Sequence, residues 1–309
     1  MGLLRVPRST GQNGLAKEVV KRITAPVGSG FWRVLNALTA VLLWSSLATL
    51  ASRLSHLPPF FLTGAALVIG SLIMAPGYRS WRVRFKTFAV GTGALFFYHA
   101  ALFVAFQRAP VVSANLVNYL WPLLIVVLAP LIQPGQRLSA RIVLAALLGF
   151  AGAALAIIGE QKLHFAPREI MGYAFALCAA LIWSSYSLVL RRLPSFADAA
   201  VGGFNLAAGC FSLMVSALFE TTPSLQTQDL LYLTIIGAGP LGLAFLFWHR
   251  AAVTLPPRKL GVLSFLTPVL STTALVFSTG KIPGWQLALG AVLVVGAIGL
   301  ALQNRTASE

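Results

Sequence analysis

Acidic residues are scarce in this chain, which has seven of them against 23 lysines and arginines among 309 positions. All seven acids fall in predicted loops, at the ends of apolar runs or in the tails, so no carboxylate is expected in the middle of an apolar run. Charged residues make up only 10% of the chain, whereas 58% is hydrophobic. This composition excludes an ordinary soluble globular protein.

Several chemical signatures are also missing. The chain contains no Gly-x-x-x-x-Gly-Lys-Ser/Thr loop, which excludes nucleotide hydrolysis by the usual P-loop route. No group of histidine, cysteine and carboxylate residues has the spacing of a metal site. Cys178 and Cys210 fall inside predicted spans, where they cannot form an extracellular disulfide framework and are expected to pack against neighbouring helices. We therefore expect no cofactor, no metal and no enzymatic activity.

Long apolar runs are what the sequence has in abundance. A hydrocarbon core about 30 Å thick requires roughly 20 apolar helical residues to cross it. Glycine and proline mark the joins between the runs. Ten runs approach the required length: approximately 33–53, 58–76, 87–107, 111–132, 139–158, 170–190, 197–219, 229–248, 260–278 and 285–302. The sequence predicts an all-α membrane protein with ten transmembrane helices.

The positive charge is distributed unevenly over the predicted loops. If the amino end is cytoplasmic, 18 of the 23 basic residues are cytoplasmic, including Arg250, and five are outside: Arg53, Arg108, Lys162, Arg168 and Lys281. This asymmetry follows the positive-inside rule and predicts that both termini are cytoplasmic. We expect the net charge of +16 to orient the protein and to contact anionic lipid rather than nucleic acid.

The predicted tails flank the apolar part of the chain. Residues 1–32 form a basic cytoplasmic tail, and residues 303–309 form a short cytoplasmic tail at the other end. The first apolar run is too long for a cleaved signal peptide, so we interpret it as an uncleaved membrane anchor.

Short motifs recur in the same order along the two halves. Leu43-Trp-Ser-Ser46 corresponds to Ile182-Trp-Ser-Ser185, and Leu120-Trp-Pro122 corresponds to Leu266-Thr-Pro268, at displacements of 139 and 146 residues. Each copy, 33–158 and 170–302, has five crossings. Because five is odd, the second copy must enter the membrane from the opposite side. The sequence predicts an inverted repeat, joined by an external linker at 159–169, of the kind that builds alternating-access transporters.

One stretch of the fourth run concentrates polar and aromatic groups. Asn115, Asn118, Tyr119, Trp121 and Pro122 lie within eight residues of a segment that otherwise spans lipid. Unpaired amides in hydrocarbon cost several kcal/mol, so these amides should face protein or a water-filled cavity. Pro122 should bend the helix because it lacks a backbone donor. A bent helix with these groups predicts a solute site in mid-membrane.

His99 is the only ionisable residue near the centre of any predicted span, which makes it a functional candidate, with Tyr98 beside it. We expect His99 to bond a substrate or a gate; the alternative is a neutral imidazole bonded to a neighbouring helix. Tyr119 and Trp121 are suited to stacking on an aromatic ring, unless they belong to an interfacial aromatic belt. Asn115 and Asn118 could bind an amino acid's carboxylate and ammonium, or could hold helices together.

Further residues are candidates for gates, hinges and packing faces. The symmetry mates Trp44 and Trp183, with Tyr186 one turn further on, suit either gating or binding, while Trp248 and Trp285 are aromatic-belt candidates. The candidate hinges are Pro110, Pro122, Pro256, Pro257 and Pro268. Small residues predict close-packing faces: Ala145, Gly149 and Ala153 on one helix, and Gly284, Ala288 and Gly296 on its mate. We expect a monomer, with dimerisation a secondary possibility.

A resemblance to a known transporter family rests on two motifs, Asn118-Tyr-Leu-Trp-Pro122 and Tyr98-His99. Over residues 33–302 the chain resembles the drug/metabolite transporter superfamily in its ten-helix EamA-type branch, and more narrowly the bacterial aromatic amino-acid exporters of the YddG type. The resemblance implies a basket-shaped fold with a central cavity open to one side at a time. It also implies an inner-membrane exporter of Phe, Tyr, Trp and similar amphipathic compounds, with some tolerance for xenobiotics.

The absence of a carboxylate from the middle of any predicted span bears on how transport is driven. Proton-coupled carriers usually keep an Asp, Glu or His inside the membrane. Because only His99 fits here, we favour facilitated, gradient-driven efflux, with proton-coupled drug or metabolite efflux through His99 as the alternative. A channel should show a repeated selectivity element or a charged ring, and a membrane enzyme should show clustered polar groups. The sequence has neither.

Overall fold

The computed structural model describes residues 30–133, 135, 138–159, 166–278, 280 and 282–303. Residues 1–29 and 304–309 of the predicted tails, and residues 160–165 of the predicted linker, lie outside the described residues.

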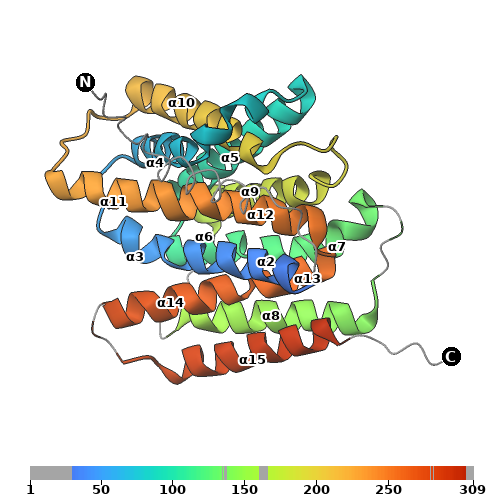
Figure 1. Cartoon of the computed structure of the whole chain (residues 1–309). Coiled ribbons are helices and arrows are strands. Elements are labelled where there is room, and N and C mark those ends of the chain that lie inside the picture. Colours follow the sequence, from blue (N-terminus) through green and yellow to red (C-terminus); the bar gives the residue numbers. More distant parts are fainter. Residues whose placement is uncertain are drawn as a thin grey trace, which may run out of the picture.

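The described part of the chain is a bundle of helices without strands (Figure 1). Ten helical segments are long and apolar enough to cross a membrane, which confirms the predicted number: Gly30–Ser52, Pro59–Trp81, Phe85–Arg108, Val111–Ile132, Ala140–Ile158, Pro167–Val189, Asp198–Phe219, Thr227–Thr254, Pro257–Ser278 and Trp285–Leu302. The eighth span differs most from its prediction, because it continues to Thr254 instead of ending at residue 248.

Some spans are single α-helices and others are interrupted. The third, fifth and tenth spans are α5 (Phe85–Arg108), α8 (Ala140–Ile158) and α15 (Trp285–Leu302). The second is α4 (Pro59–Met74) with a 3₁₀ end at Ala75–Trp81, the sixth α9 (Ile170–Val189), and the seventh α10 (Val201–Phe219). The interrupted spans are α2 (Gly30–Ser45) with α3 (Leu47–Ser52), α6 (Val111–Asn118) with α7 (Trp121–Ile132), and α13 (Pro257–Ser264) with α14 (Leu266–Ser278). In the eighth span, a π-helical segment, η4 (Gly239–Leu243), joins α11 (Thr227–Ala238) to α12 (Ala244–Thr254).

Two prolines account for matching breaks in the fourth and ninth spans. A proline cannot donate to the carbonyl four residues before it. For Pro122 that carbonyl belongs to Asn118, the last residue of α6, and for Pro268 it belongs to Ser264, the last residue of α13. The helices therefore break at the same offset in the two halves. Pro110 and Pro256 instead precede α6 and α13 directly, so they mark helix starts.

The helices pack in pairs, and each pair described here has one helix from the first half and one from the second. The second, fourth and fifth spans each pack against their own mates, as α4 with α10, α7 with α13 and α8 with α15. The third span packs on the sixth, as α5 with α9, and correspondingly the eighth packs on the first, as α12 with α2. Exchanging the halves leaves this set of pairs unchanged, as expected for two structural repeats, while their inverted relation stays a prediction.

Small residues let α8 and α15 approach closely. A Cβ atom on Gly152 would lie 2.6 Å from the carbonyl oxygen of Gly290, and one on Gly290 would lie 2.6 Å from that of Gly152. The predicted face at Ala145, Gly149 and Ala153 is buried, as expected. The predicted face on α15 is wrong, because Ala288 and Gly296 are exposed and the buried residues there are Leu287, Gly290, Val294, Ala297 and Ala301.

The packing prediction for the two cysteines is also wrong. Cys178 and Cys210 are free and exposed, on faces of α9 and α10 that are turned away from the neighbouring helices. Such apolar side chains need no protein partner in a bilayer, because lipid covers them.

The close contact of α8 with α15 predicts that Gly152→Ala lowers stability. The added methyl group must displace a backbone carbonyl, and overpacking of this kind costs about 1–3 kcal/mol. Thermal unfolding in detergent, followed by tryptophan fluorescence, measures the effect. Gly296→Ala is the matched control, since nothing lies within 4 Å of its Cβ position. Equal melting temperatures for the two variants would contradict the predicted contact.

Candidate functional site

A cavity of about 410 Å³ lies inside the bundle, with walls from both halves of the chain. All seven residues predicted to form a solute site line it: Tyr98, His99, Asn115, Asn118, Tyr119, Trp121 and Trp183. Trp44 lines it too, whereas Tyr186 and the candidate hinges Pro110, Pro122, Pro256 and Pro268 do not. The structure thus brings together predicted residues from four separate spans, the first, third, fourth and sixth.

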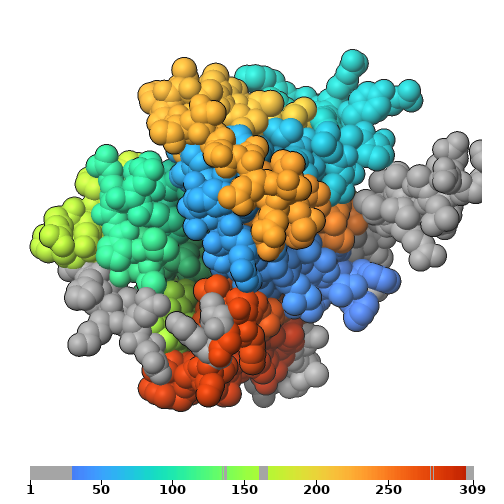
Figure 2. Space-filling model, turned by 90° about the vertical axis from the view of Figure 1, so that its left-hand side faces the viewer, coloured from blue at the N-terminus to red at the C-terminus, as the bar shows by residue number. Residues whose placement is uncertain are grey.

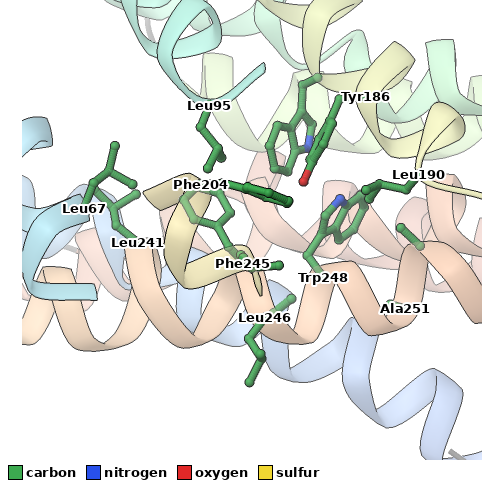
Figure 3. Close-up of a cluster of buried hydrophobic side chains, with 14 of the residues drawn as sticks. Leu67, Leu95, Tyr186, Leu190, Phe204, Leu241, Phe245, Leu246, Trp248 and Ala251 are labelled. Atoms are coloured by element: carbon green, nitrogen blue, oxygen red, sulfur yellow. The ribbon is translucent and has the colours of Figure 1, made fainter. Parts of the chain in front are cut away.

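Three indole rings, those of Trp44, Trp121 and Trp183, line one side of this cavity. The ring of Trp248 packs against all three, and we call the four residues the tryptophan layer. The ring of Trp44 lies 6.4, 5.6 and 5.1 Å from those of Trp121, Trp183 and Trp248, measured between centroids. Trp183 stacks on Trp248 at 6.0 Å, and Trp121 meets Trp248 edge-on at 5.4 Å. Figure 3 shows Trp248 beside Phe245 and Tyr186 in this region. Tyr186 is buried and packs against Trp183 at 5.6 Å.

The position of Trp248 differs from the one that the sequence predicted. The sequence placed it near the end of a span, as a candidate for the aromatic belt, but its side chain is only 1% exposed. The reason is that the eighth span continues beyond it to Thr254, which puts Trp248 well inside the helix. Trp285, at 66% exposed and at the start of α15, fits the belt.

The π-helical segment supplies backbone acceptors to this region. The indole Nε1 of Trp44 donates to the Pro240 carbonyl at 3.0 Å, and the Asn205 amide donates to the Leu241 carbonyl at 2.8 Å. π-turns are uncommon and gather at functional sites. Here the segment places Leu241 and, one turn on, Phe245 in the cavity wall. The indole Nε1 of Trp248 donates to the Ser187 hydroxyl at 3.1 Å.

The polar groups of the cavity wall are uncharged. No Asp, Glu, Lys or Arg is among the described residues that line it. The amide of Asn118 donates to the Tyr98 hydroxyl at 3.4 Å, and Nδ1 of His99 lies 2.7 Å from the Leu95 carbonyl oxygen. Three polar lining residues escaped the sequence analysis: Thr63, Thr267 and Ser271. Thr267 could have been found as the symmetry mate of Trp121, but Thr63 and Ser271 carry no comparable signal.

The cavity extends toward one end of the bundle, which we call the mouth end. Its wall includes Ala51, Phe106 and Val111, near the ends of α3, α5 and α6, and Val111 is 56% exposed. Figure 2 views the molecule from this end, where α3 and α4 (blue), α5 and α6 (green) and α14 and α15 (red) meet. The tryptophan layer lies on the opposite side of the cavity, toward what we call the floor end.

A second cavity of about 560 Å³ lies at the floor end, beyond the tryptophan layer along α7, α9 and α12. Its wall includes Gln133, the segment 190–196, Asp198 and His249. The amide of Gln133 donates to the Leu188 carbonyl at 2.9 Å and so ties the two halves together. The Arg191 guanidinium donates to the Val253 carbonyl at 3.2 Å, and burial, with repulsion from Arg33, lowers the pKa of Arg191.

The floor end also holds an ionic cluster that corrects one prediction. Arg250 is 7% exposed and lies inside α12 rather than in a loop, where its Nε donates to Asp198 at 2.6 Å. His249, near the end of the same span, is 4% exposed, and its Nε2 lies 3.6 Å from Asp198. Hydropathy falls at these two residues, which is why the predicted span ended early. The helix continues because Asp198 offsets the arginine's charge.

Comparison with known proteins agrees with this architecture. The profile of the EamA-like transporter family matches the chain twice, at residues 31–158 and 170–303, so the protein belongs to that family. The predicted resemblance is confirmed, and the chain is an integral, multi-pass inner-membrane transporter of small molecules.

Individual relatives within the family indicate a narrower class of transporter. The chain is 38% identical, over 85% of its own length and 94% of the relative's, to the protein named aromatic amino acid exporter YddG of Ancylobacter novellus. It is 28% identical to the protein of the same name from Escherichia coli K12, over 85% and 94% of the two chains. The threonine/homoserine exporter RhtA of E. coli K12 is 27% identical, over 80% and 83%. A crystal structure with 37% sequence identity superimposes with a TM-score of 0.82, covering 87% of this chain and 97% of the other.

The ionic cluster predicts that Asp198→Asn destabilises the protein. It leaves the buried Arg250 without its counter-charge, and breaking a buried pair from one side costs about 3–5 kcal/mol. Thermal unfolding in detergent is the measurement. Removing both charges, as Asp198→Asn with Arg250→Met, should recover part of the loss.

A surface ion pair provides the control for this experiment. Arg168→Gln removes a partner of Glu169 at 3.9 Å, but Arg168 is 87% exposed, so the change should cost at most about 1 kcal/mol. Equal effects of Asp198→Asn and Arg168→Gln would rule out a stabilising role for the buried cluster.

Proposed function

We propose that this protein exports aromatic amino acids and similar amphipathic compounds by alternating access. The observation that carries the proposal is the uncharged, ring-lined cavity of about 410 Å³ bounded by the tryptophan layer. Its volume falls within the range of small-molecule sites. The relatives named as aromatic amino acid exporters support the same substrate class.

The rings of the wall favour an aromatic substrate. Tyr98, Tyr119, Trp121, Trp183 and Phe245 offer flat apolar area at the cavity surface. Each aromatic contact contributes about 0.5–1.5 kcal/mol beyond area burial, which suits the weak affinity that a carrier needs. A small hydroxylated amino acid, such as the substrates in the name of the RhtA relative, would leave these rings unused.

The polar groups of the wall suit a zwitterion. Asn115, Asn118, Tyr98 and His99 bring donors and acceptors to the cavity without bringing net charge. An amino acid with a neutral side chain places its charged groups only among these donors and acceptors, whereas lysine would place a second ammonium group among the rings, where no described residue of the wall can pair with it. Burying an unpaired charge is strongly unfavourable. We expect the cavity to select against charged side chains.

The arrangement of the two cavities and of the helix breaks supports alternating access. The tryptophan layer separates the central cavity from the second cavity at the floor end. The breaks before Pro122 and Pro268 give each half a hinge beside this layer. With both termini cytoplasmic, the mouth end faces outward, and this conformation is the outward-facing one. Because one chain supplies both halves of the wall, we propose that the monomer is the working unit.

Facilitated, gradient-driven efflux fits a cavity without carboxylates. The alternative, proton-coupled efflux, would use His99, and a transport measurement distinguishes the two. The full-length protein is reconstituted in liposomes, and uptake of radiolabelled Phe, Trp, Leu and Lys is compared with and without a proton gradient. We expect Phe and Trp to exceed Leu, with Lys at background and no strict need for the gradient. Uptake of Lys equal to that of Phe would refute the aromatic selectivity, and strict dependence on the gradient would refute the facilitated mechanism.

The stacking role predicts the effect of removing one ring. Trp121→Ala should raise the Phe concentration for half-maximal uptake by about 2- to 13-fold, the equivalent of one aromatic contact. Trp285→Ala is the matched control, because Trp285 is 66% exposed and lies outside the cavity wall. The prediction is wrong if the two variants change uptake equally.

A further inference from the structure

The hydrogen bond of His99 fixes which of its ring nitrogens carries a proton. Nδ1 lies 2.7 Å from the Leu95 carbonyl oxygen, which can only accept, so Nδ1 is the donor. The side chain is 8% exposed, and no Asp or Glu lines the cavity among the described residues. An imidazolium there would be an unpaired charge away from water, so the ring is neutral. Nε2 is then a bare lone pair that accepts and cannot donate.

This lone pair is open to the cavity. No described residue bonds Nε2 of His99, and Nε2 is not among the fully enclosed unpaired atoms, in contrast to Nδ1 of His249. Because His99 lines the cavity, Nε2 presents its lone pair to whatever occupies the space.

A second acceptor lies nearby without a partner. The amide Nδ2 of Asn118 donates to the Tyr98 hydroxyl, which orients the amide, and its Oδ1 is enclosed and unpaired. The ring of Tyr98 lies 5.0 Å from that of His99 and so links the two groups. No described residue donates to Oδ1, so its partial negative charge adds to that of the other acceptors in this part of the wall.

Aromatic faces complete this part of the wall. The rings of Phe103 and Phe245 each lie 6.3 Å from the His99 ring, on the same cavity. Aromatic faces carry partial negative charge and attract cations. We call His99, Asn118, Tyr98, Phe103 and Phe245 the acceptor corner. The corner presents a lone pair and ring faces to the cavity, holds an enclosed carbonyl without a partner, and has no charged donor.

We infer that the acceptor corner receives the protonated amine of the substrate, which donates a hydrogen bond to Nε2 of His99. The inference rests on the proposed function and adds that the amine, rather than the carboxylate, is the group that the cavity selects. The substrate class is therefore a protonated primary amine that carries an aromatic ring. An aromatic acid without an amine finds no donor of opposite charge in the wall and binds weakly.

A set of three ligands tests this ranking on the full-length protein. Phenylalanine, 2-phenylethylamine and 3-phenylpropanoate share the ring and differ in the polar groups. Their binding is measured in detergent by quenching of tryptophan fluorescence, and their competition against labelled Phe is measured in liposomes. We expect 2-phenylethylamine to bind within a few-fold of phenylalanine and 3-phenylpropanoate to bind at least 10-fold more weakly.

Variants of His99 then test whether this residue is the group that selects the amine. His99→Leu removes the acceptor and should weaken phenylalanine and 2-phenylethylamine by about 10- to 100-fold, the value of one hydrogen bond to a charged group. The binding of 3-phenylpropanoate should change by less than about 2-fold. His99→Gln returns an acceptor oxygen and should recover part of the loss. Cys178→Ser, on the exposed face of α9, is the control for expression and reconstitution.

The outcomes separate the two proposals. If the wild-type protein binds 3-phenylpropanoate as tightly as phenylalanine, or if His99→Leu weakens all three ligands equally, the amine assignment is wrong while the proposed function stands. If the wild-type protein binds and transports none of the three, the proposed function itself fails. The comparison of ligands on the wild-type protein decides the assignment even if His99→Leu does not fold.

Discussion

The rest of the structure depends on the contacts among the four rings of the tryptophan layer, which close the bundle toward the floor end. Two of its rings, Trp44 and Trp121, come from the first half, and two, Trp183 and Trp248, come from the second. Their edge-to-face and stacked contacts join the halves between the central cavity and the second cavity at the floor end. Rings with polar N–H groups suit this place because they pack as apolar bodies and can still bond backbone or ligand. The central cavity exists because this layer blocks it on one side only.

The need to satisfy polar groups away from water explains the shape of the cavity wall. Pro122 frees the Asn118 carbonyl, and the π-helical segment gives the Pro240 and Leu241 carbonyls to Trp44 and Asn205. Irregular backbone at membrane depth is tolerated only where protein or a water-filled cavity covers it. The interrupted spans therefore line the cavity, together with the unbroken helices α5 and α9, while α8 and α15 pack at the edge of the bundle (Figure 1).

The sequence predicted the spans and the central residues because both depend on local composition. Ten apolar runs set the helix count, and polar groups inside an apolar run, such as Asn118 and His99, had to turn inward. The errors have a common cause, since they involve partners distant in the chain. Arg250 stays in its helix because of Asp198, and Trp248 is buried because the eighth span continues past it. The face that α15 buries depends on its register against α8, which its own sequence does not encode.

If the protein works by the alternating access proposed above, the differences between symmetry mates identify the parts that must change. In an inverted repeat the two access states exchange the conformations of the halves. Here the third span is one unbroken helix, α5, whereas its mate, the eighth span, contains the π-helical segment. Trp44 bonds that segment through its indole N–H, whereas the N–H of its mate Trp183 has no bond to any described residue. Because both differences lie at the tryptophan layer, the proposed alternating access would require the contacts that close the floor end to exchange for the cavity to open there.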